Sequence, residues 1–530
     1  MLHVHVLHVH VLHEIAIVHS TFAARPEGSQ DKDRARMTSG AITSVVLVIL
    51  DGLRPDMVTA DVMPNLFAFR AHATDFVHAK TVFPSVTSVA AASIATGELP
   101  MRHGVMGNEA FGGATSRERV LDFRDHRIVR GLDQSLMLGL VAAPTFADVL
   151  AKSRRTLAIV DAGVPVASSL LNPRAARNGH WTFSTHGRDA TATPQAWDDV
   201  VRRHGFPPER ELPRFDEVRY ATDVFIAKVI GGAPPDVAVL WLPEPDATSS
   251  YRELGSLECE NALRHVDRHL GRVLAAVQHR QGLERTLVIV ASDHGQISVT
   301  TRVDVAAEMR RAGFKAGDRN DLAGADVVVT GQGYGAIHCM TENAGRDARL
   351  VDWLMQQRWI GNLFSRPAAT AGLDAIEGRF AGTLSHAIAG LAHDRAADLV
   401  LTFGSSSGLD RHGVPGRGAH NSVSAHRMGT HGGLNAMEMS CVLLVAGPGF
   451  GRGLANHAVA GIVDIAPTIA ARFGLELGRQ VAGRDLCRLV GQQRRTIRIK
   501  AGLGSYRQSL IVGEAGGHRP EMDEGATPSV

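Results

Sequence analysis

The chain has 530 residues, of which 44% are hydrophobic and 21% are charged, so it is long enough for one large α/β domain with insertions or for two to three average domains. Its 56 basic and 54 acidic side chains leave a formal net charge of +2, which argues against a protein that binds nucleic acid or an anionic membrane through its overall charge. The four cysteines form no CxxC pair, which excludes a disulfide framework and a thiolate zinc site, and no apolar run is long enough to span a bilayer.

Both ends of the chain are predicted to be disordered tails. Residues 1–39 begin with a repeated Leu-His-Val-His-Val sequence, which is typical of a low-complexity segment, although the alternation could form a strand and the histidines could bind a metal. No Lys or Arg precedes this stretch and histidines interrupt its apolar core, so it does not resemble a secretory signal and we expect a cytoplasmic protein. Translation could start at Met1 or at Met37, near which ordered structure is expected to begin. Residues 495–530 form the second predicted tail.

Between the tails, short strands that are apolar on both faces alternate with helical stretches. This pattern predicts an α/β fold with a mostly parallel central sheet sandwiched by helices. The clearest predicted strands are residues 45–50, 157–160, 237–242, 287–291 and 441–445. The catalytic core is expected to cover residues 40–300 and 401–494, and residues 301–400 are expected to form an inserted cap, with helices at 303–312 and 346–357 and strands at 325–330 and 336–340.

Residues that can bind metals follow three of these strands. Asp51 follows the first, Asp246 ends a Glu-Pro-Asp sequence after the third, and Asp293 and His294 follow the fourth. Because the carboxyl ends of parallel strands meet at one edge of a sheet, these carboxylates would converge there, and a divalent cation would hold them together. Adjacent oxygen and nitrogen donors suit zinc or manganese. Each aspartate alone could equally be a helix cap or a turn residue.

His431 and a group of hydroxyls are further candidates. His431 lies among glycines, which gives an imidazole little reason to pack there, so a metal ligand is favoured. Ser85, Thr87 and Ser88 lie where an alanine-rich helix is predicted to begin, close to free backbone N–H groups and the positive end of the helix dipole. One of these hydroxyls could be ionised by a metal and attack phosphorus, or could simply cap the helix. Asn108, in a glycine-rich turn, could donate to a phosphoryl oxygen or only form the turn.

Six ordered motifs together resemble the alkaline phosphatase superfamily, and most closely its nucleotide pyrophosphatase/phosphodiesterase-like branch, over roughly residues 40–490. The motifs are Asp51 after the first strand, Phe83-Pro84-Ser85-Val86-Thr87, His103-Gly104 through Asn108, Glu244-Pro245-Asp246, Ser292-Asp293-His294-Gly295 and Gly429-Thr430-His431-Gly432. The resemblance implies a metal-dependent hydrolase of phosphodiester or pyrophosphate bonds in a small phosphorylated substrate. It also implies two divalent ions, usually Zn²⁺, with Mn²⁺ as the alternative, and a covalent intermediate on a threonine or serine.

The family pattern carries over to individual positions of this chain. By position, one ion would be bound by Asp51, Thr87, Asp293 and His294, and the other by Asp246 and His431. Thr87 would be the nucleophile, because its spacing to Thr96-Gly97 matches that of the family's nucleophile, and Asn108 would contact the phosphoryl group.

Two positions depart from the family pattern. Four residues after Asp246, where the family has a histidine that completes one metal site, this chain has Ser250, and a neutral hydroxyl is a poor substitute for imidazole on zinc. The second ion is therefore expected to bind weakly, to recruit another donor such as His420 or His426, or to be absent. Ser88 stands where nucleotide-cleaving members commonly have an aromatic residue, so phosphodiester chemistry is better supported than a nucleotide substrate.

Other functions of the same fold stay open at this point. They are a phosphomonoesterase, a phosphonate hydrolase, and a catalytically impaired member that binds a phosphorylated ligand. No nucleic-acid or membrane partner is expected, and the sequence contains no indication of an oligomeric state.

Overall fold

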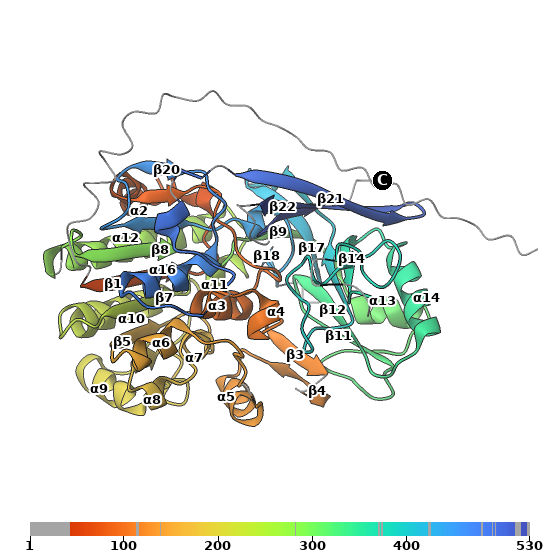
Figure 1. Ribbon diagram of the computed structural model, residues 1–530, viewed down its shortest axis with the longest axis horizontal. Helices are drawn as coiled ribbons and strands as arrows, with labels where there is room; N and C mark the ends of the chain where they lie inside the picture. The colour runs from red at the N-terminus through yellow and green to blue at the C-terminus, as the bar shows by residue number, and fades with distance from the viewer. Residues whose placement is uncertain are drawn as a thin grey trace, which may run out of the picture.

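A computed structural model describes most of the chain (Figure 1). The described residues are 43–112, 116–137, 139–280, 282–368, 372, 375–421, 426–478, 481–489, 491–492, 494–514 and 521–526. The N-terminal tail predicted over residues 1–39 lies outside them.

An eight-stranded sheet forms the centre of the larger part of the molecule (Figure 1). In spatial order its strands are β20 (Leu454–Asn456), β2 (Thr74–Phe76), β19 (Leu443–Ala446), β8 (Thr286–Ala291), β1 (Ser44–Leu50), β7 (Val237–Leu242), β5 (Leu157–Asp161) and β6 (Trp181–Ser184). Strand β19 is antiparallel to both neighbours, and every other neighbouring pair is parallel. The predicted fold class, a mostly parallel sheet between helices, is confirmed.

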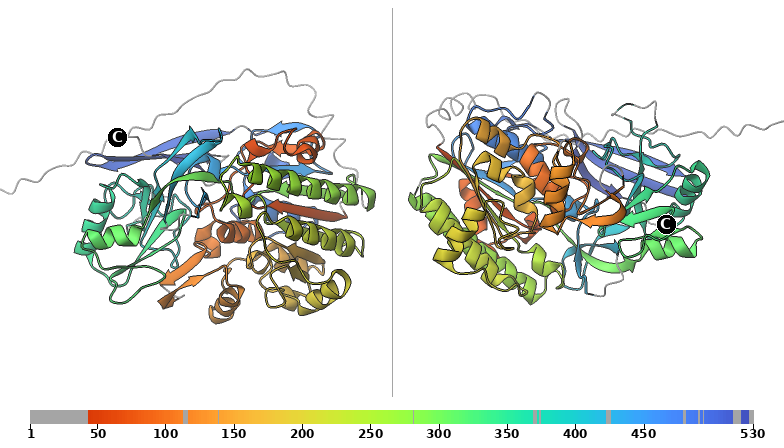
Figure 2. Two further views of the ribbon diagram at one scale, coloured as in Figure 1. Left: turned by 180° about the vertical axis from the view of Figure 1, so that it is seen from behind. Right: turned by 90° about the horizontal axis from the view of Figure 1, so that it is seen from below.

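Helices cover both faces of this sheet because its strands are apolar on both sides. All seven residues of β1 are buried, with Val45, Leu47 and Ile49 in one hydrophobic cluster and Val46 and Val48 in another. The layer facing the viewer in Figure 1 includes α3 (Thr87–Thr96), α6 (Phe146–Lys152), α7 (Ala167–Leu171) and α16 (Ile465–Arg472). The opposite layer, seen from behind in Figure 2, includes α2 (Pro64–Phe69), α10 (Phe215–Val224) and α12 (Leu257–Arg280).

A second sheet lies beside the core, at the right of Figure 1. Its strands are β10 (Ala316–Gly317), β11 (Val327–Thr330), β12 (Tyr334–Cys339), β15 (Leu399–Phe403), β13 (Ile360–Ser365) and β14 (Leu384–Ser385). Helices α13 (Val305–Arg311) and α14 (Ala344–Leu354) share a hydrophobic cluster with it. These elements fall where the sequence predicts a cap, whose boundaries stay a prediction.

A four-stranded sheet connects the core with this second sheet. Its order is β16 (Ser405–Leu409), β17 (Pro415–Asn421), β9 (Ile297–Val303) and β18 (Gly429–Thr430). Strand β9 begins three residues after His294, and β18 pairs with its first two residues. This pairing brings His431, which follows β18, next to the end of β8.

The prediction of disorder after residue 495 is wrong for residues 495–514. Strands β21 (Arg495–Leu503) and β22 (Tyr506–Glu514) form a sheet with β23 (Glu521–Ala526). The Tyr506 hydroxyl donates to the Gly361 carbonyl at 2.7 Å, and the Gln508 side chain hydrogen-bonds both the N–H and the carbonyl of Leu363. Ile497 and Ile499, two residues apart on β21, pack against the main hydrophobic cluster. This alternation is the signal of an amphipathic strand, which scattered Arg and Gly residues obscured.

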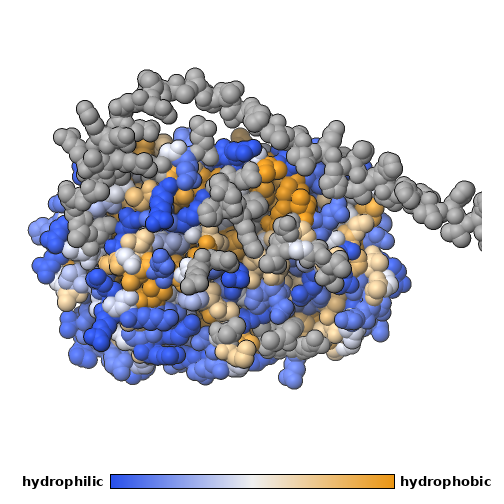
Figure 3. Space-filling view, viewed as in Figure 1, coloured by the Kyte–Doolittle hydropathy of each residue, from blue (hydrophilic) through white to orange (hydrophobic). Residues whose placement is uncertain are grey.

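Within the described residues, no helix has the length and hydrophobicity needed to cross a membrane. The face shown in Figure 3 is mainly hydrophilic around its edge, with hydrophobic residues in smaller areas. Large exposed apolar side chains such as Met137, Phe206 and Leu409 come from separate elements, as is usual for single apolar residues on a protein surface.

Candidate active site

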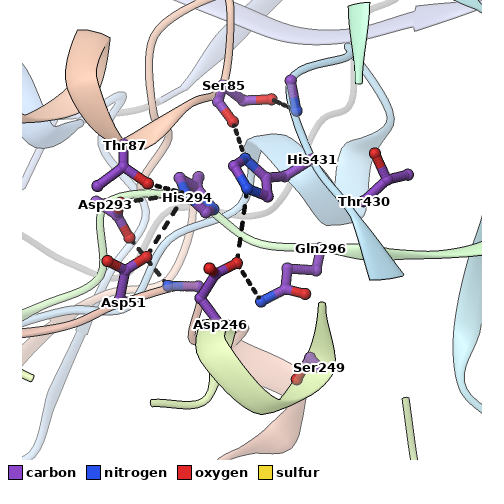
Figure 4. Close-up of polar contacts among 12 residues, drawn as sticks. Asp51, Ser85, Thr87, Asp246, Ser249, Asp293, His294, Gln296, Thr430 and His431 are labelled. Atoms are coloured by element: carbon purple, nitrogen blue, oxygen red, sulfur yellow. Dashed lines mark hydrogen bonds and ion pairs between the residues drawn. The ribbon is translucent and has the colours of Figure 1, made fainter. Parts of the chain in front are cut away.

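The predicted site residues meet at one edge of the central sheet (Figure 4). Strands β8, β1 and β7 are neighbours and parallel, so the residues that follow them, Asp293, Asp51 and Asp246, arrive at the same edge. Helix α3 begins at Thr87, and β18 ends directly before His431. The topology of the sheet therefore assembles side chains that are up to 380 residues apart in the chain.

Asp51, Thr87, Asp293 and His294 form what we call the inner cluster. All four residues are at most 3% exposed. His294 Nε2 lies 3.1 Å from Thr87 Oγ1, 3.2 Å from Asp293 Oδ2 and 3.7 Å from Asp51 Oδ1. The other ring nitrogen, Nδ1, lies 3.0 Å from the Gly295 carbonyl, to which it donates. Nε2 therefore carries the lone pair and points it toward the three oxygens.

Each of the two carboxylates of the inner cluster accepts a hydrogen bond through one of its oxygens. Asp51 Oδ2 accepts from Trp241 Nε1 at 3.0 Å, and Asp293 Oδ1 accepts from the Gly52 N–H at 3.0 Å. The remaining oxygens, Asp51 Oδ1 and Asp293 Oδ2, are buried and have no hydrogen-bond partner in the described part of the chain. Buried polar atoms rarely lack partners in a folded protein, and here two of them face one imidazole lone pair.

These carboxylates cannot easily carry their charges without a counter-ion. Burial first, and then repulsion from Asp293 and Asp246, raises the pKa of Asp51 well above its ordinary value. Burial is also the main cause that raises the pKa of Asp293 to about 7. A divalent cation would remove this penalty, and two carboxylate oxygens, a hydroxyl and an imidazole are a donor set that suits zinc or manganese. The inner cluster therefore fits a divalent ion.

Asp246 and His431 form what we call the outer pair. His431 Nε2 lies 3.6 Å from Asp246 Oδ1, and His431 Nδ1 donates to the Ser85 carbonyl at 2.9 Å. The rings of His431 and His294 stack, with centroids 3.8 Å apart and planes at 12°. Suitable donor atoms of Asp246, His294 and His431 lie within 4.8 Å of one another. The outer pair is thus adjacent to the inner cluster, but its side chains remain 17% and 9% exposed.

Gln296 contacts the outer pair and was not identified from the sequence. It is 1% exposed, and its Nε2 donates to Asp246 Oδ1 at 2.9 Å (Figure 4). This N–H group satisfies the same oxygen that faces His431. Gln296 follows the Asp293-His294-Gly295 motif directly, and that position is the one signal that could have identified it.

The third donor expected for the outer pair is missing. Ser250 lies one helical turn after Asp246, and its Oγ is buried with no hydrogen-bond partner among the described residues. His420 Nδ1 lies 2.8 Å from Thr430 Oγ1, and His426 is exposed. Neither histidine belongs to a group of candidate ligands found in the described residues. The outer pair therefore offers two donors of its own and fits a second ion less well than the inner cluster fits the first.

Asn108 lies next to the start of α3. Its Oδ1 accepts from the Ser88 N–H at 3.1 Å, which leaves its amide NH₂ group directed elsewhere. The structure thus brings together the six predicted metal ligands, with Asn108 beside the start of α3, whereas His426 does not join them. Their roles in metal binding and catalysis stay predictions.

Comparisons with known proteins point to one family. Residues 45–405 match the profile of the family described as type I phosphodiesterase/nucleotide pyrophosphatase. Among curated proteins, none matches the chain significantly.

Solved structures show the same fold. Murine ectonucleotide pyrophosphatase/phosphodiesterase 5, in an inactive threonine-to-alanine form with AMP, has a TM-score of 0.56 at 15% identity and covers 83% of this chain and 96% of its own. The human counterpart has a TM-score of 0.53 at 16% identity over 85% of this chain and 100% of its own. Phosphonoacetate hydrolase from Sinorhizobium meliloti 1021, with phosphonoacetate, has a TM-score of 0.56 at 17% identity over 82% of this chain and 96% of its own.

Proposed function

Since the chain belongs to the type I phosphodiesterase/nucleotide pyrophosphatase family of the alkaline phosphatase superfamily, we propose that it hydrolyses phosphodiester or pyrophosphate bonds through a covalent intermediate on Thr87. The observation that carries this proposal is the inner cluster. A hydroxyl lies 3.1 Å from an imidazole nitrogen, beside two buried carboxylate oxygens that have no hydrogen-bond partner among the described residues. The murine neighbour described as inactive carries alanine in place of a threonine, which supports a threonine as the reacting group.

A divalent metal completes the proposed machinery. Asp51, Asp293 and His294, with Thr87, would bind Zn²⁺, or Mn²⁺ as the alternative, and Asp246 with His431 would contribute to a second ion. When bound, such ions act as Lewis acids that lower the pKa of a hydroxyl and neutralise charge on a phosphoryl group.

The residues of the chain itself position and attack the substrate. Thr87 Oγ1 loses its proton to solvent and forms a bond to phosphorus while the bond from phosphorus to the leaving oxygen breaks, and the leaving oxygen takes up a proton from solvent. Asn108 donates from its NH₂ group to a phosphoryl oxygen, and the N-terminus of the ten-residue helix α3 favours the negative charge there. Water then attacks phosphorus, and Thr87 is released as the hydroxyl.

A phosphonate hydrolase is a second candidate function. One neighbour of similar fold is a hydrolase seen with phosphonoacetate, and another is seen with AMP, so both a small phosphonate and a nucleotide are compatible with this architecture. A catalytically impaired phospho-ligand binder is the alternative that Ser250 favours, because the outer pair lacks its third donor.

The decisive experiment measures initial rates on a chromogenic phosphodiester and the matching monoester, with zinc or manganese added. We expect metal-dependent hydrolysis of the diester that Thr87→Ala abolishes while the unfolding temperature is retained. Ser88→Ala, which removes the neighbouring hydroxyl, is the matched control and should retain most of the rate. Substantial hydrolysis by Thr87→Ala would refute the assignment of the nucleophile, and no hydrolysis of either ester by the wild type would favour the phospho-ligand binder.

A further inference from the structure

A cavity of about 480 Å³, counting the space open to solvent, adjoins the proposed site. Its lining includes Val86, which directly precedes Thr87, and the proposed site residues Asn108 and His431. The rest of the lining comes from residues 331–333 and Tyr334, the first residue of β12, and from the charged or polar residues Glu109, Arg124, His420, Arg427 and Thr430. We call this cavity the side pocket. A substrate whose phosphoryl group contacts Asn108 would place its neighbouring atoms here.

Most charges around the side pocket neutralise one another. Asp122 binds Arg124 at 2.6 Å and Arg319 at 2.7 Å, and Arg319 also binds Glu109 at 3.1 Å. Glu109 accepts a further hydrogen bond from the Gly331 N–H at 3.0 Å. These two carboxylates and two guanidinium groups have equal and opposite charges, so Glu109 does not make the pocket acidic.

Arg427 also lines the side pocket, but this network of ion pairs does not neutralise its charge. Its guanidinium group lies 5.3 Å from the centre of the Tyr251 ring and 3.5 Å from Gln332 Oε1, and no carboxylate within the described residues pairs with it. Arg427 is half-buried, and its charge acts on both His420 and His431. A guanidinium group held by an aromatic ring and facing a cavity is suited to binding a carboxylate or a phosphate.

His420 adds a donor to the same pocket. It is 2% exposed, and its Nε2 has no hydrogen-bond partner in the described part of the chain. When the Thr430 hydroxyl donates to His420 Nδ1, which lies 2.8 Å away, the ring proton is on Nε2. That N–H group would then be available to an anionic ligand.

We propose that the side pocket binds a second anionic group of the substrate, a carboxylate or a phosphate, through Arg427 and His420. This inference rests on the proposed function, because it assumes that the reacting phosphoryl group binds between Thr87 and Asn108. It defines the substrate class as phosphorylated compounds that carry another negative charge a short distance from the reacting phosphorus atom.

Three phosphonates of similar size test this proposal by calorimetry on the zinc-loaded full chain. Propylphosphonate has no second charge, phosphonopropionate has a carboxylate in its place, and ethylenediphosphonate has a second phosphonate. We expect at least one of the doubly charged ligands to bind about ten- to hundredfold more tightly than propylphosphonate, the range that a hydrogen bond to a charged group supplies. The ligand that gains more identifies carboxylate or phosphate as the preferred group.

Arg427→Gln should remove most of this preference while propylphosphonate binding changes little. Arg427→Lys keeps the charge and should retain part of the preference, and its unfolding temperature controls for misfolding. Arg311→Gln, which removes an exposed arginine of α13, is the matched control and should keep the full preference for the doubly charged ligands. The proposal is overturned if the wild type binds the three ligands equally, or if Arg427→Gln weakens all three by the same factor.

This result and the rate assay distinguish the two proposals. Ester hydrolysis without a preference among the phosphonates would refute the side pocket and retain the hydrolase. A preference that depends on Arg427, without any ester hydrolysis, would retain the pocket and refute the hydrolase.

Discussion

The inner cluster and the outer pair lie side by side but differ in how completely the chain surrounds a cation. The inner cluster supplies four donors that are at most 3% exposed, and its two carboxylates each keep one oxygen without a protein partner. The outer pair supplies two donors that are 17% and 9% exposed, and the facing oxygen of Asp246 already accepts from Gln296. The carboxylates of the inner cluster require a positive charge, whereas in the outer pair the neutral amide of Gln296 already stabilises the Asp246 carboxylate.

The origin of the donors explains this difference. Three of the four inner donors follow β1 and β8, adjacent strands that are completely buried, so the sheet itself determines where these side chains lie. The outer pair depends instead on the short helix α11 (Asp246–Ser249) and on the two-residue strand β18. Replacement of one side chain, such as the residue at position 250, changes the outer donor set without disturbing the core.

Asp51→Asn should have the largest effect, because it removes a charge from the inner cluster. We expect zinc affinity to fall by more than about a hundredfold, since even residues that only orient metal ligands contribute ten- to hundredfold. The chelated protein should become more stable at neutral pH, because burial and Asp293 raise the pKa of Asp51 and the charged form is therefore costly. Zinc titrations followed by calorimetry and by thermal unfolding measure both changes.

Asp161→Asn is the matched control for this change. Asp161 ends β5, two strands away on the same sheet edge, and burial raises its pKa to about 7 as well. Both of its oxygens accept from backbone N–H groups, of Gly163 and Ser168, so it lacks an oxygen for a metal. Zinc affinity should stay at the wild-type value. An equal loss of affinity in both variants would show that the inner cluster is not the zinc site.

Gln296→Met should have an intermediate effect and test the outer pair. It removes the N–H group that satisfies Asp246, so the chelated protein should lose about 1–2 kcal/mol of unfolding free energy. Excess zinc should raise the unfolding free energy of this variant by more than it raises that of the wild type, because a cation can replace the amide beside Asp246. Chemical unfolding with and without zinc measures the difference. Gln357→Met is the control, because the Gln357 side chain donates to the Trp353 carbonyl of α14 at 2.8 Å, in the part of the molecule that contains the second sheet. An equal response of both variants to zinc would contradict a link between Gln296 and the outer pair.

The sequence predicted the parts of the molecule that depend on strong local patterns. Strands apolar on both faces indicated the parallel sheet, and the acidic residues after β1, β7 and β8 indicated the site edge. The direction of β19 was not predictable, because an apolar run is the same in either direction. Gln296 was missed because an amide next to a motif has no distinct pattern, and Arg427 because only the fold brings it near Asn108.

Ser250→His should have the smallest effect and tests the outer pair most directly. Positions 246 and 250 lie one turn apart on the same face of a helix, and the Ser250 hydroxyl has no hydrogen-bond partner among the described residues, so an imidazole there would join Asp246 and His431. We expect wild-type protein to retain about one zinc ion per chain after dialysis and the variant to retain about two, with a rate up to about tenfold higher. Ser250→Leu, which adds volume without a donor, should retain one ion. If the wild type retains two ions and the variant gains none, another donor already completes the outer pair. The inner and outer sites would then differ in the identity of their ligands and not in how fully they are occupied.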